Sequence, residues 1–180
     1  EDVHMLTRYH RLLEEGLAES GVLSGTLLDV GSGIGALTFA LLERGMTSAV
    51  AVDASSSFIG AGRQEAERRG RADAVRFVHA DFVVAAPELE SSSVVTLDRV
   101  VCCYPSYEPL LDAALRECDQ IVELAAREGH PLGRALHLDE APGPGHHHVH
   151  VDLGAGVLGV VEVEARDASH DPHGDCRALV

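Results

Sequence analysis

Residues Thr26-Leu27-Leu28-Asp29-Val30-Gly31-Ser32-Gly33-Ile34-Gly35 decide how this chain folds. The first five form an apolar run interrupted only by Asp29, which is typical of a central parallel strand covered on both faces. The three glycines then predict a tight turn whose backbone amides are open to a ligand. The spacing fits G-x-G-x-G and, with Ala36, also the looser dinucleotide fingerprint G-x-G-x-x-A. A strand-to-helix turn that binds no ligand is the alternative interpretation.

Three later apolar runs also end near an acidic residue. Residues 49–52 precede Asp53, residues 75–79 come shortly before Asp81, and residues 94–97 precede Asp98. Because the carboxyl ends of parallel strands meet at one edge of a sheet, we expect these acids to lie beside the glycine turn. Asp53 follows the turn by about 20 residues, the spacing at which an acid accepts hydrogen bonds from ribose hydroxyls. The pattern predicts a nucleotide-type pocket.

These ordered motifs, over roughly residues 20–118, resemble the class I S-adenosylmethionine-dependent methyltransferases. The resemblance implies S-adenosyl-L-methionine as cofactor and an enzyme of class EC 2.1.1 that methylates a small-molecule acceptor. It also implies a set of cofactor-binding residues, which are Asp29, Gly31, Ser32, Gly33, Gly35, Asp53, Ala54, Asp81, Phe82 and Asp98.

The resemblance assigns parts of the cofactor to these residues. The glycine turn lines the methionine part, and Asp29 helps to hold both the turn and the amino-acid moiety. Asp53 binds the ribose diol and Ala54 lies against the adenine. Asp81 accepts the adenine amino group, with Phe82 beside the ring. The segment 99–105 is similar to a subgroup related to the magnesium-protoporphyrin methyltransferases.

No residue stands out as a catalytic base. The methyl sulfonium is already an activated electrophile, so such an enzyme can work mainly by alignment and exclusion of water. Tyr104, Asp98 and His79 are the candidates near the donor methyl, should the acceptor have to lose a proton. Each has a structural alternative: packing for Tyr104, fixing a loop for Asp98, and an ordinary hydrogen bond at a strand end for His79.

Two other functions fit parts of the sequence. An NAD(P)-dependent oxidoreductase would use the G-x-G-x-x-A pattern, but Asp29 and Asp81 argue against it. A non-catalytic remnant that binds S-adenosylmethionine would fit the unusual C-terminal composition, since eight of the 11 histidines follow residue 129. These histidines lie among glycines and prolines at no recognised ligand spacing, so we predict biased composition and no metal site.

The composition of the chain argues against some classes of binding partner. It has 180 residues and a net charge of −15, and its 14 basic residues are all arginine. This charge argues against a nucleic-acid partner, because phosphate binding uses clustered basic residues. No run is long enough to span a membrane and no signal peptide is visible. Four cysteines without a C-x-x-C pair suggest buried thiols in a reducing cytoplasm. No oligomeric state is predicted.

Alternating strands and helices predict an α/β fold. The expected strands are 26–30, 48–52, 75–79 and 94–98, and the expected helices are 4–19, 34–44, 55–69 and 107–128. They indicate a doubly wound, mostly parallel sheet with helices on both faces, incomplete or irregular at its C-terminal part. Residues 1–128 form the cofactor-binding domain in this interpretation.

Residues 129–180 are expected to form a divergent segment. It contains a β-hairpin from 147–153 and 157–165 and a disordered tail. No fifth strand is clear after the last helix, and 135–138 is the best candidate. A truncated or frame-shifted tail is the hypothesis that accounts for the change in composition. Family-like motifs absent from every alternative reading frame of the coding sequence would count against it.

Overall fold

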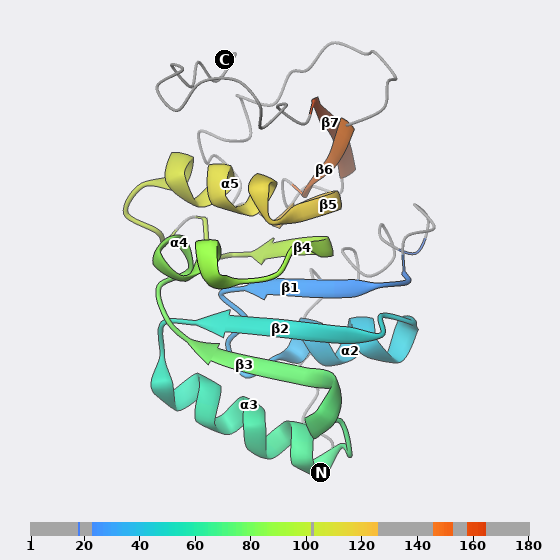
Figure 1. Ribbon diagram of the computed structural model, residues 1–180, viewed down its shortest axis with the longest axis vertical. Coiled ribbons are helices and arrows are strands. Elements are labelled where there is room, and N and C mark those ends of the chain that lie inside the picture. The colour runs from blue at the N-terminus through green and yellow to red at the C-terminus, as the bar shows by residue number, and fades with distance from the viewer. Residues whose placement is uncertain (1–17, 19–22, 102, 126–145, 153–157, 165–180) are drawn as a thin grey trace.

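The computed structural model describes residues 18, 23–101, 103–125, 146–152 and 158–164 (Figure 1). Strands and helices alternate along most of this part of the chain: β1 (Thr26–Val30), α2 (Ala36–Arg44), β2 (Ser48–Asp53), α3 (Ser56–Arg68), η1 (Ala72–Ala74), β3 (Val75–His79), α4 (Phe82–Ala85), η2 (Ala86–Glu88), β4 (Ser92–Asp98), α5 (Tyr107–Arg116), β5 (Cys118–Ala125), β6 (His146–Asp152) and β7 (Leu158–Glu164).

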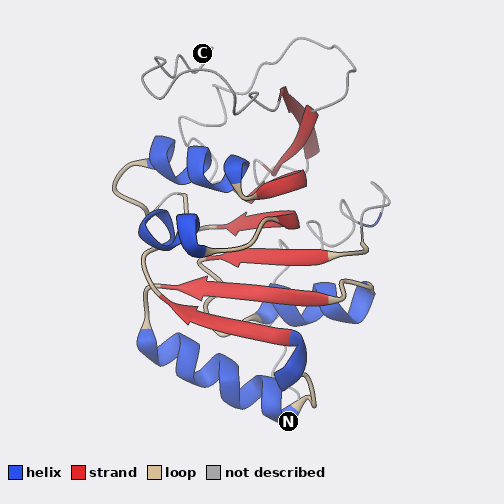
Figure 2. Cartoon of the chain, in the orientation of Figure 1, coloured by secondary structure: helices blue, strands red, loops and turns tan. Residues whose placement is uncertain are grey.

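The strands form one seven-stranded sheet in the order β3-β2-β1-β4-β5-β6-β7. Figure 2 shows it as a continuous sheet with the helices beside it. Neighbouring strands are parallel from β3 to β6, and only β7 runs antiparallel to its neighbour. The predicted α/β class and mostly parallel sheet are therefore confirmed. The order reverses direction at β1 and β4, the place where ligands bind in open α/β sheets.

Each face of the sheet carries its own apolar core, because successive strand residues point to opposite sides. Leu28 of β1 packs in one cluster with Leu110 of α5, while Leu27 packs in the other with Leu41 of α2 and Ile59 of α3. All five side chains are at most 1% exposed. Burial on both faces explains the continuously apolar composition of the central strands.

The first four strands and helices α2 and α3 lie close to their predicted positions. Strands β1 and β3 have the predicted ends, and β2 extends one residue further, to Asp53. Helix α3 begins after Ser55, whose side chain caps it by accepting a hydrogen bond from the Phe58 amide. Helix α2 begins at Ala36 rather than at Ile34, because the preceding Gly35 has a left-handed φ of 86°.

The predicted helix 107–128 is wrong in its second half. Helix α5 ends at Arg116, and β5 occupies Cys118–Ala125 as the fifth strand that the sequence failed to indicate. The Ser92 amide at the start of β4 donates to the Glu117 carbonyl, and Cys118 is paired with Ser92 in the sheet. After α5 ends, the chain therefore pairs with the edge of β4 and continues as a strand. The alternative candidate, 135–138, lies outside the described residues.

The C-terminal strands extend the same sheet. Strand β6 pairs with β5 in parallel, and β7 pairs with β6 antiparallel over the region from which a hairpin was predicted. The connection between β6 and β7 lies outside the described residues, as do the tail after 164 and all of the predicted helix 4–19 except Ala18, which is helical. No helix in the described part of the chain is long and apolar enough to cross a membrane.

Candidate cofactor site

The glycine turn after β1 has the backbone geometry that its sequence predicts. Gly31, Gly33 and Gly35 have φ values of 70°, 57° and 86°, a region that side-chain-bearing residues rarely adopt. A Cβ added to Gly31 would lie 2.8 Å from the Cβ of Val100, so the segment after β4 approaches the turn closely. A Cβ on Gly33 would meet nothing within 4 Å among the described residues. The turn is therefore tightly packed at Gly31 and open at Gly33.

Asp53, at the end of β2, is hydrogen-bonded to this turn. Its Oδ2 atom accepts a hydrogen bond of 2.9 Å from the Gly33 amide, and its Oδ1 atom accepts one of 2.7 Å from the Ser55 amide. Two backbone donors hold the carboxylate in one orientation. Each carboxylate oxygen can accept a second hydrogen bond, so the group can still bind hydroxyls of a ligand.

Asp81 follows β3 and lies at the other side of the same pocket. Its Oδ1 atom accepts hydrogen bonds from the Val83 amide (3.0 Å) and from the Tyr104 hydroxyl (2.7 Å). Burial raises the pKa of Tyr104 to about 12, and the hydrogen bond to Asp81 contributes to this shift. The phenol therefore stays protonated near neutral pH and acts as a hydrogen-bond donor.

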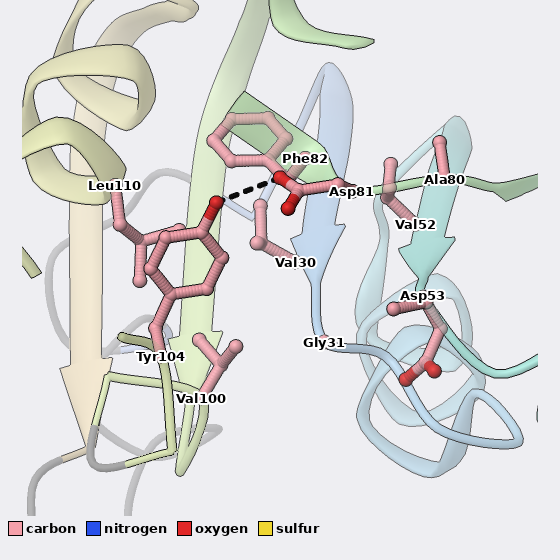
Figure 3. Close-up of a pocket in the computed structure, with 11 residues that line it drawn as sticks. Val30, Gly31, Val52, Asp53, Ala80, Asp81, Phe82, Val100, Tyr104 and Leu110 are labelled. Atoms are coloured by element: carbon pink, nitrogen blue, oxygen red, sulfur yellow. Dashed lines mark hydrogen bonds between the residues drawn. The ribbon is translucent and has the colours of Figure 1, made fainter. Parts of the chain in front are cut away.

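These groups line one pocket at the carboxyl ends of β1 to β4 (Figure 3). In Figure 3 the Asp53 side chain points toward the glycine turn, and the Asp81 side chain points toward Tyr104. The lining residues are Val30, Gly31, Val52, Asp53, Ala54, Ala80, Asp81, Phe82, Val100, Tyr104 and Leu110. Five predicted cofactor-binding residues are among them: Gly31, Asp53, Ala54, Asp81 and Phe82.

Asp29 lies behind the pocket rather than in its lining. It is 1% exposed and accepts hydrogen bonds from the hydroxyls of Thr38 on α2 (2.5 Å) and Thr96 on β4 (2.8 Å). Both threonines are fully buried. The carboxyl group thus links β1 to the helix after the glycine turn and to the neighbouring strand, which agrees with a role in holding the turn.

Three other predicted residues also lie outside the pocket lining. Ser32, Gly33 and Gly35 belong to the turn, and the Ser32 Oγ atom is buried without a hydrogen-bond partner among the described residues. A buried hydroxyl of this kind normally finds a partner in water or a ligand. Together with the open space at Gly33, it fits a polar ligand that lies along the turn.

Each of the three catalytic candidates interacts with another residue of the chain. Asp98, at the end of β4, pairs through Oδ2 with Arg99 Nε at 3.3 Å, and its side chain is 9% exposed. The ring of His79 makes a 3.0 Å contact from Nε2 to the carbonyl oxygen of Ala54. Neither residue lines the pocket, whereas Tyr104 does.

Sequence reasoning missed several contacts of the site. It did not place Val100 against the glycine turn, pair Tyr104 with Asp81, or find the threonine partners of Asp29. Cys103 is exposed rather than buried as predicted, whereas Cys118 is buried. Among the described residues no group of three or more potential ligands is arranged to hold a metal ion.

The sequence profile described as a methyltransferase domain matches residues 27–124, which is more than half of the chain. The chain therefore belongs to the methyltransferase domain family, and its fold is that of the class I S-adenosylmethionine-dependent methyltransferases. S-Adenosylmethionine is the cofactor that this membership supports. No curated protein sequence matches the chain significantly.

Solved structures share this fold. A proposed sarcosine dimethylglycine methyltransferase from Galdieria sulphuraria is 20% identical, with a TM-score of 0.58 over 63% of this chain and 43% of that one. A proposed S-adenosylmethionine-dependent methyltransferase from Methanococcus maripaludis is 19% identical, with a TM-score of 0.57 over 81% and 56%. Magnesium protoporphyrin IX methyltransferase from Synechocystis, with S-adenosylmethionine bound, is 21% identical, with a TM-score of 0.52 over 62% and 55%.

At these identities the likeness establishes the fold and not the substrate. The chain spans about half the length of the structures that it matches.

Proposed function

We propose that this chain binds S-adenosyl-L-methionine and transfers its methyl group to a small-molecule acceptor. One observation carries the proposal. Gly31, Asp53 and Asp81 follow three adjacent strands and line the same pocket at the carboxyl ends of these strands. Family membership supports the same cofactor.

The residues present fit the three parts of this cofactor. The carboxylate of Asp53, already oriented by two amides, is suited to the ribose diol. Asp81 is exposed and presents a carboxylate to the adenine amino group, with buried Phe82 beside it. The open face at Gly33 and the start of α2, whose first turn holds no acidic residue, suit the methionine moiety and its carboxylate.

The bound cofactor supplies an activated methyl group, so the protein has to orient the acceptor and exclude water. The Tyr104 hydroxyl donates a hydrogen bond to Asp81, and its pKa of about 12 disfavours the phenolate. It therefore serves the pocket as a donor rather than as a base. Asp98 and His79 remain candidates only if they exchange their present partners for the acceptor.

The acceptor itself follows from no residue in the described part of the chain. A small molecule methylated at oxygen, nitrogen or carbon is the proposal, and the likeness of segment 99–105 to the magnesium-protoporphyrin subgroup remains a prediction. A cytoplasmic location, the absence of nucleic-acid partners and the division into residues 1–128 and 129–180 also stay predictions.

Isothermal titration of the full chain tests the proposal. S-Adenosylhomocysteine should bind at a 1:1 ratio, whereas NAD and NADP should give no heat of binding. Binding of a nicotinamide cofactor without S-adenosylhomocysteine would contradict the proposal and favour an oxidoreductase. Turnover of labelled S-adenosylmethionine with a panel of acceptors then separates an enzyme from a non-catalytic remnant.

A further inference from the structure

Asp81 carries both of its observed hydrogen bonds on the same oxygen. The Val83 amide and the Tyr104 hydroxyl donate to Oδ1, at 3.0 and 2.7 Å. In Figure 3 the second oxygen points away from this bond, on the side of Val30, which also lines the pocket. The carboxylate is therefore held by one atom, and its other atom faces the pocket.

Tyr104 is itself held by packing and by a backbone hydrogen bond. Its ring packs against the apolar core that contains Leu110, and its backbone amide donates to the Val100 carbonyl at 3.1 Å. The residue lies 23 positions after Asp81 and belongs to the segment that follows β4. Its hydroxyl thus fixes the end of β3 from a separate part of the fold.

We infer that Tyr104 is a positioning residue for recognition of the adenine amino group. It holds Asp81 through Oδ1 so that Oδ2 is aimed at the 6-amino group of the cofactor. This inference rests on the proposed function, because it assumes that the pocket binds an adenosine. It assigns Tyr104 a role in cofactor selection that is separate from proton transfer.

The chemistry favours this arrangement. A carboxylate that is already fixed loses little rotamer freedom when a ligand binds, so its hydrogen bond contributes more to affinity. The hydroxyl proton remains in place at neutral pH because the pKa of Tyr104 is about 12. A purine with hydrogen in place of the 6-amino group leaves Oδ2 without a ligand donor. The site should therefore distinguish the two purines through Asp81.

A competing arrangement has a different signature. If the amino group must displace the Tyr104 hydroxyl from Asp81, the tyrosine is an obstacle to binding. Removing the hydroxyl would then strengthen the binding of the adenine ligand. The direction of the change in affinity therefore distinguishes positioning from competition.

The test compares S-adenosylhomocysteine with its 6-deamino purine analogue, by isothermal titration of the full chain. The wild type should prefer the amino-bearing ligand by about tenfold, the scale of one hydrogen bond to a charged group. Tyr104→Phe, which keeps the ring, should reduce this preference at least about threefold. Because the preference compares two ligands on one protein, a partial loss of folded protein affects both Kd values equally and cancels.

Two further variants complete the design. Tyr107→Phe is the matched control, since Tyr107 packs against the same core but does not line the pocket, and its preference should equal that of the wild type. Asp81→Ala should lose the preference, and adding Tyr104→Phe to it should change the preference no further.

The outcomes separate the two proposals. An unchanged preference in Tyr104→Phe, or tighter binding of S-adenosylhomocysteine, overturns the inference while the proposed function stands. A wild type that binds neither ligand overturns the proposed function, and the inference falls with it. A reduced preference that depends on Asp81 supports both.

Discussion

Asp53 orients the glycine turn as well as facing the pocket. Its two oxygens accept hydrogen bonds from the Gly33 and Ser55 amides, which belong to the turns after β1 and β2. The carboxylate therefore fixes the relative positions of two segments that both contribute residues to the pocket lining. A substitution at this position should weaken cofactor binding through the lost ligand contact and through a looser turn.

Asp53→Ala should weaken the binding of S-adenosylhomocysteine by roughly 1.5–3 kcal/mol, because it removes hydrogen bonds to a charged group. Isothermal titration measures the change. Asp73→Ala is the control, since Asp73 lies in η1 before β3, away from the pocket lining, and its affinity should match the wild type. Equal affinities for the two variants would remove Asp53 from the site.

Asp29 should matter for stability more than for ligand contacts. Asp29→Ala leaves the buried Thr38 and Thr96 hydroxyls without an acceptor, so we expect a loss of about 2–4 kcal/mol in the free energy of unfolding. Thr96→Val removes only one of these two bonds and should cost less. Urea denaturation measures both values. A loss below about 0.5 kcal/mol for Asp29→Ala would contradict this account.

The sequence predicted the location of some site residues but not the side chains that contact them. Asp53 and Asp81 were predictable, because an acid at the end of a parallel strand has to lie at the ligand-binding edge. Asp29 was predicted to hold the turn, but its partners Thr38 and Thr96 were not found. These side chains meet only through packing of α2 and β4 on β1, which no local pattern encodes. The contact between Tyr104 and Asp81 depends on the same kind of tertiary packing.

Helices α2 and α3 are joined by a charged network on one side of the sheet. Glu65 accepts hydrogen bonds from Arg68 and Arg69, and Arg69 also pairs with Glu43 of α2 at 3.0 Å. The Arg69 guanidinium lies 4.9 Å from the ring centre of Phe39. Arg69 therefore links the end of α3 to α2.

The network makes the stability depend on pH. Hydrogen bonds from Arg68 and Arg69 lower the pKa of Glu65 from 4.5 to about 2. Because the folded-state value is the lower one, the stabilisation is complete above about pH 4.5 and is lost as the pH falls toward 2. Glu65→Gln should therefore cost on the order of 1 kcal/mol at pH 7 and close to nothing at pH 2.

Urea denaturation across this pH range measures the effect. Glu67→Gln on the same helix is the control, because Glu67 is exposed and forms no ion pair with another described residue. Its effect on the free energy of unfolding should be small at every pH. A cost of Glu65→Gln that does not change between pH 7 and pH 2 would show that the ion pairs contribute nothing.

Two glycines of α3 provide a matched test of how closely this helix approaches β3. A Cβ on Gly62 would lie 2.4 Å from Cε1 of the buried Phe77, whereas a Cβ on Gly60 would meet nothing within 4 Å. Gly62→Ala should destabilise the fold by about 1–3 kcal/mol through overpacking. Gly60→Ala should stabilise it by about 0.5–1 kcal/mol through helix propensity. Equal stabilities in thermal denaturation would contradict the observed packing.

Residues 118–125 were predicted as helix but form β5, because the local pattern does not include pairing with a distant strand. Apolar residues recur at helical spacing from Leu110 to Leu124, with no glycine or proline between them, so the pattern predicts one long helix. The structure ends the helix at Arg116 because the open edge of β4 pairs with residues 118–125. The adjacent β-branched residues Ile121 and Val122 were the local signal for a strand, and helical periodicity masked it.

The whole molecule brings four strand ends to one pocket. The order β3-β2-β1-β4 places the segments after β1, β2, β3 and β4 next to one another, although they are up to 70 residues apart in sequence. The alternation of strands and helices was sufficient to predict this architecture. In the C-terminal part of the sheet, β6 and β7 lie within one residue of the predicted hairpin strands 147–153 and 157–165, whereas β5 was not predicted, because its residues continue the helical spacing of α5.

A crystal structure of the full chain with S-adenosylhomocysteine tests the central claim most directly. The account predicts ribose hydroxyls within hydrogen-bond distance of Asp53, the adenine amino group on Asp81, and the homocysteine moiety along the turn at Gly33. A ligand bound elsewhere, or one whose ribose and adenine contact neither carboxylate, would contradict it.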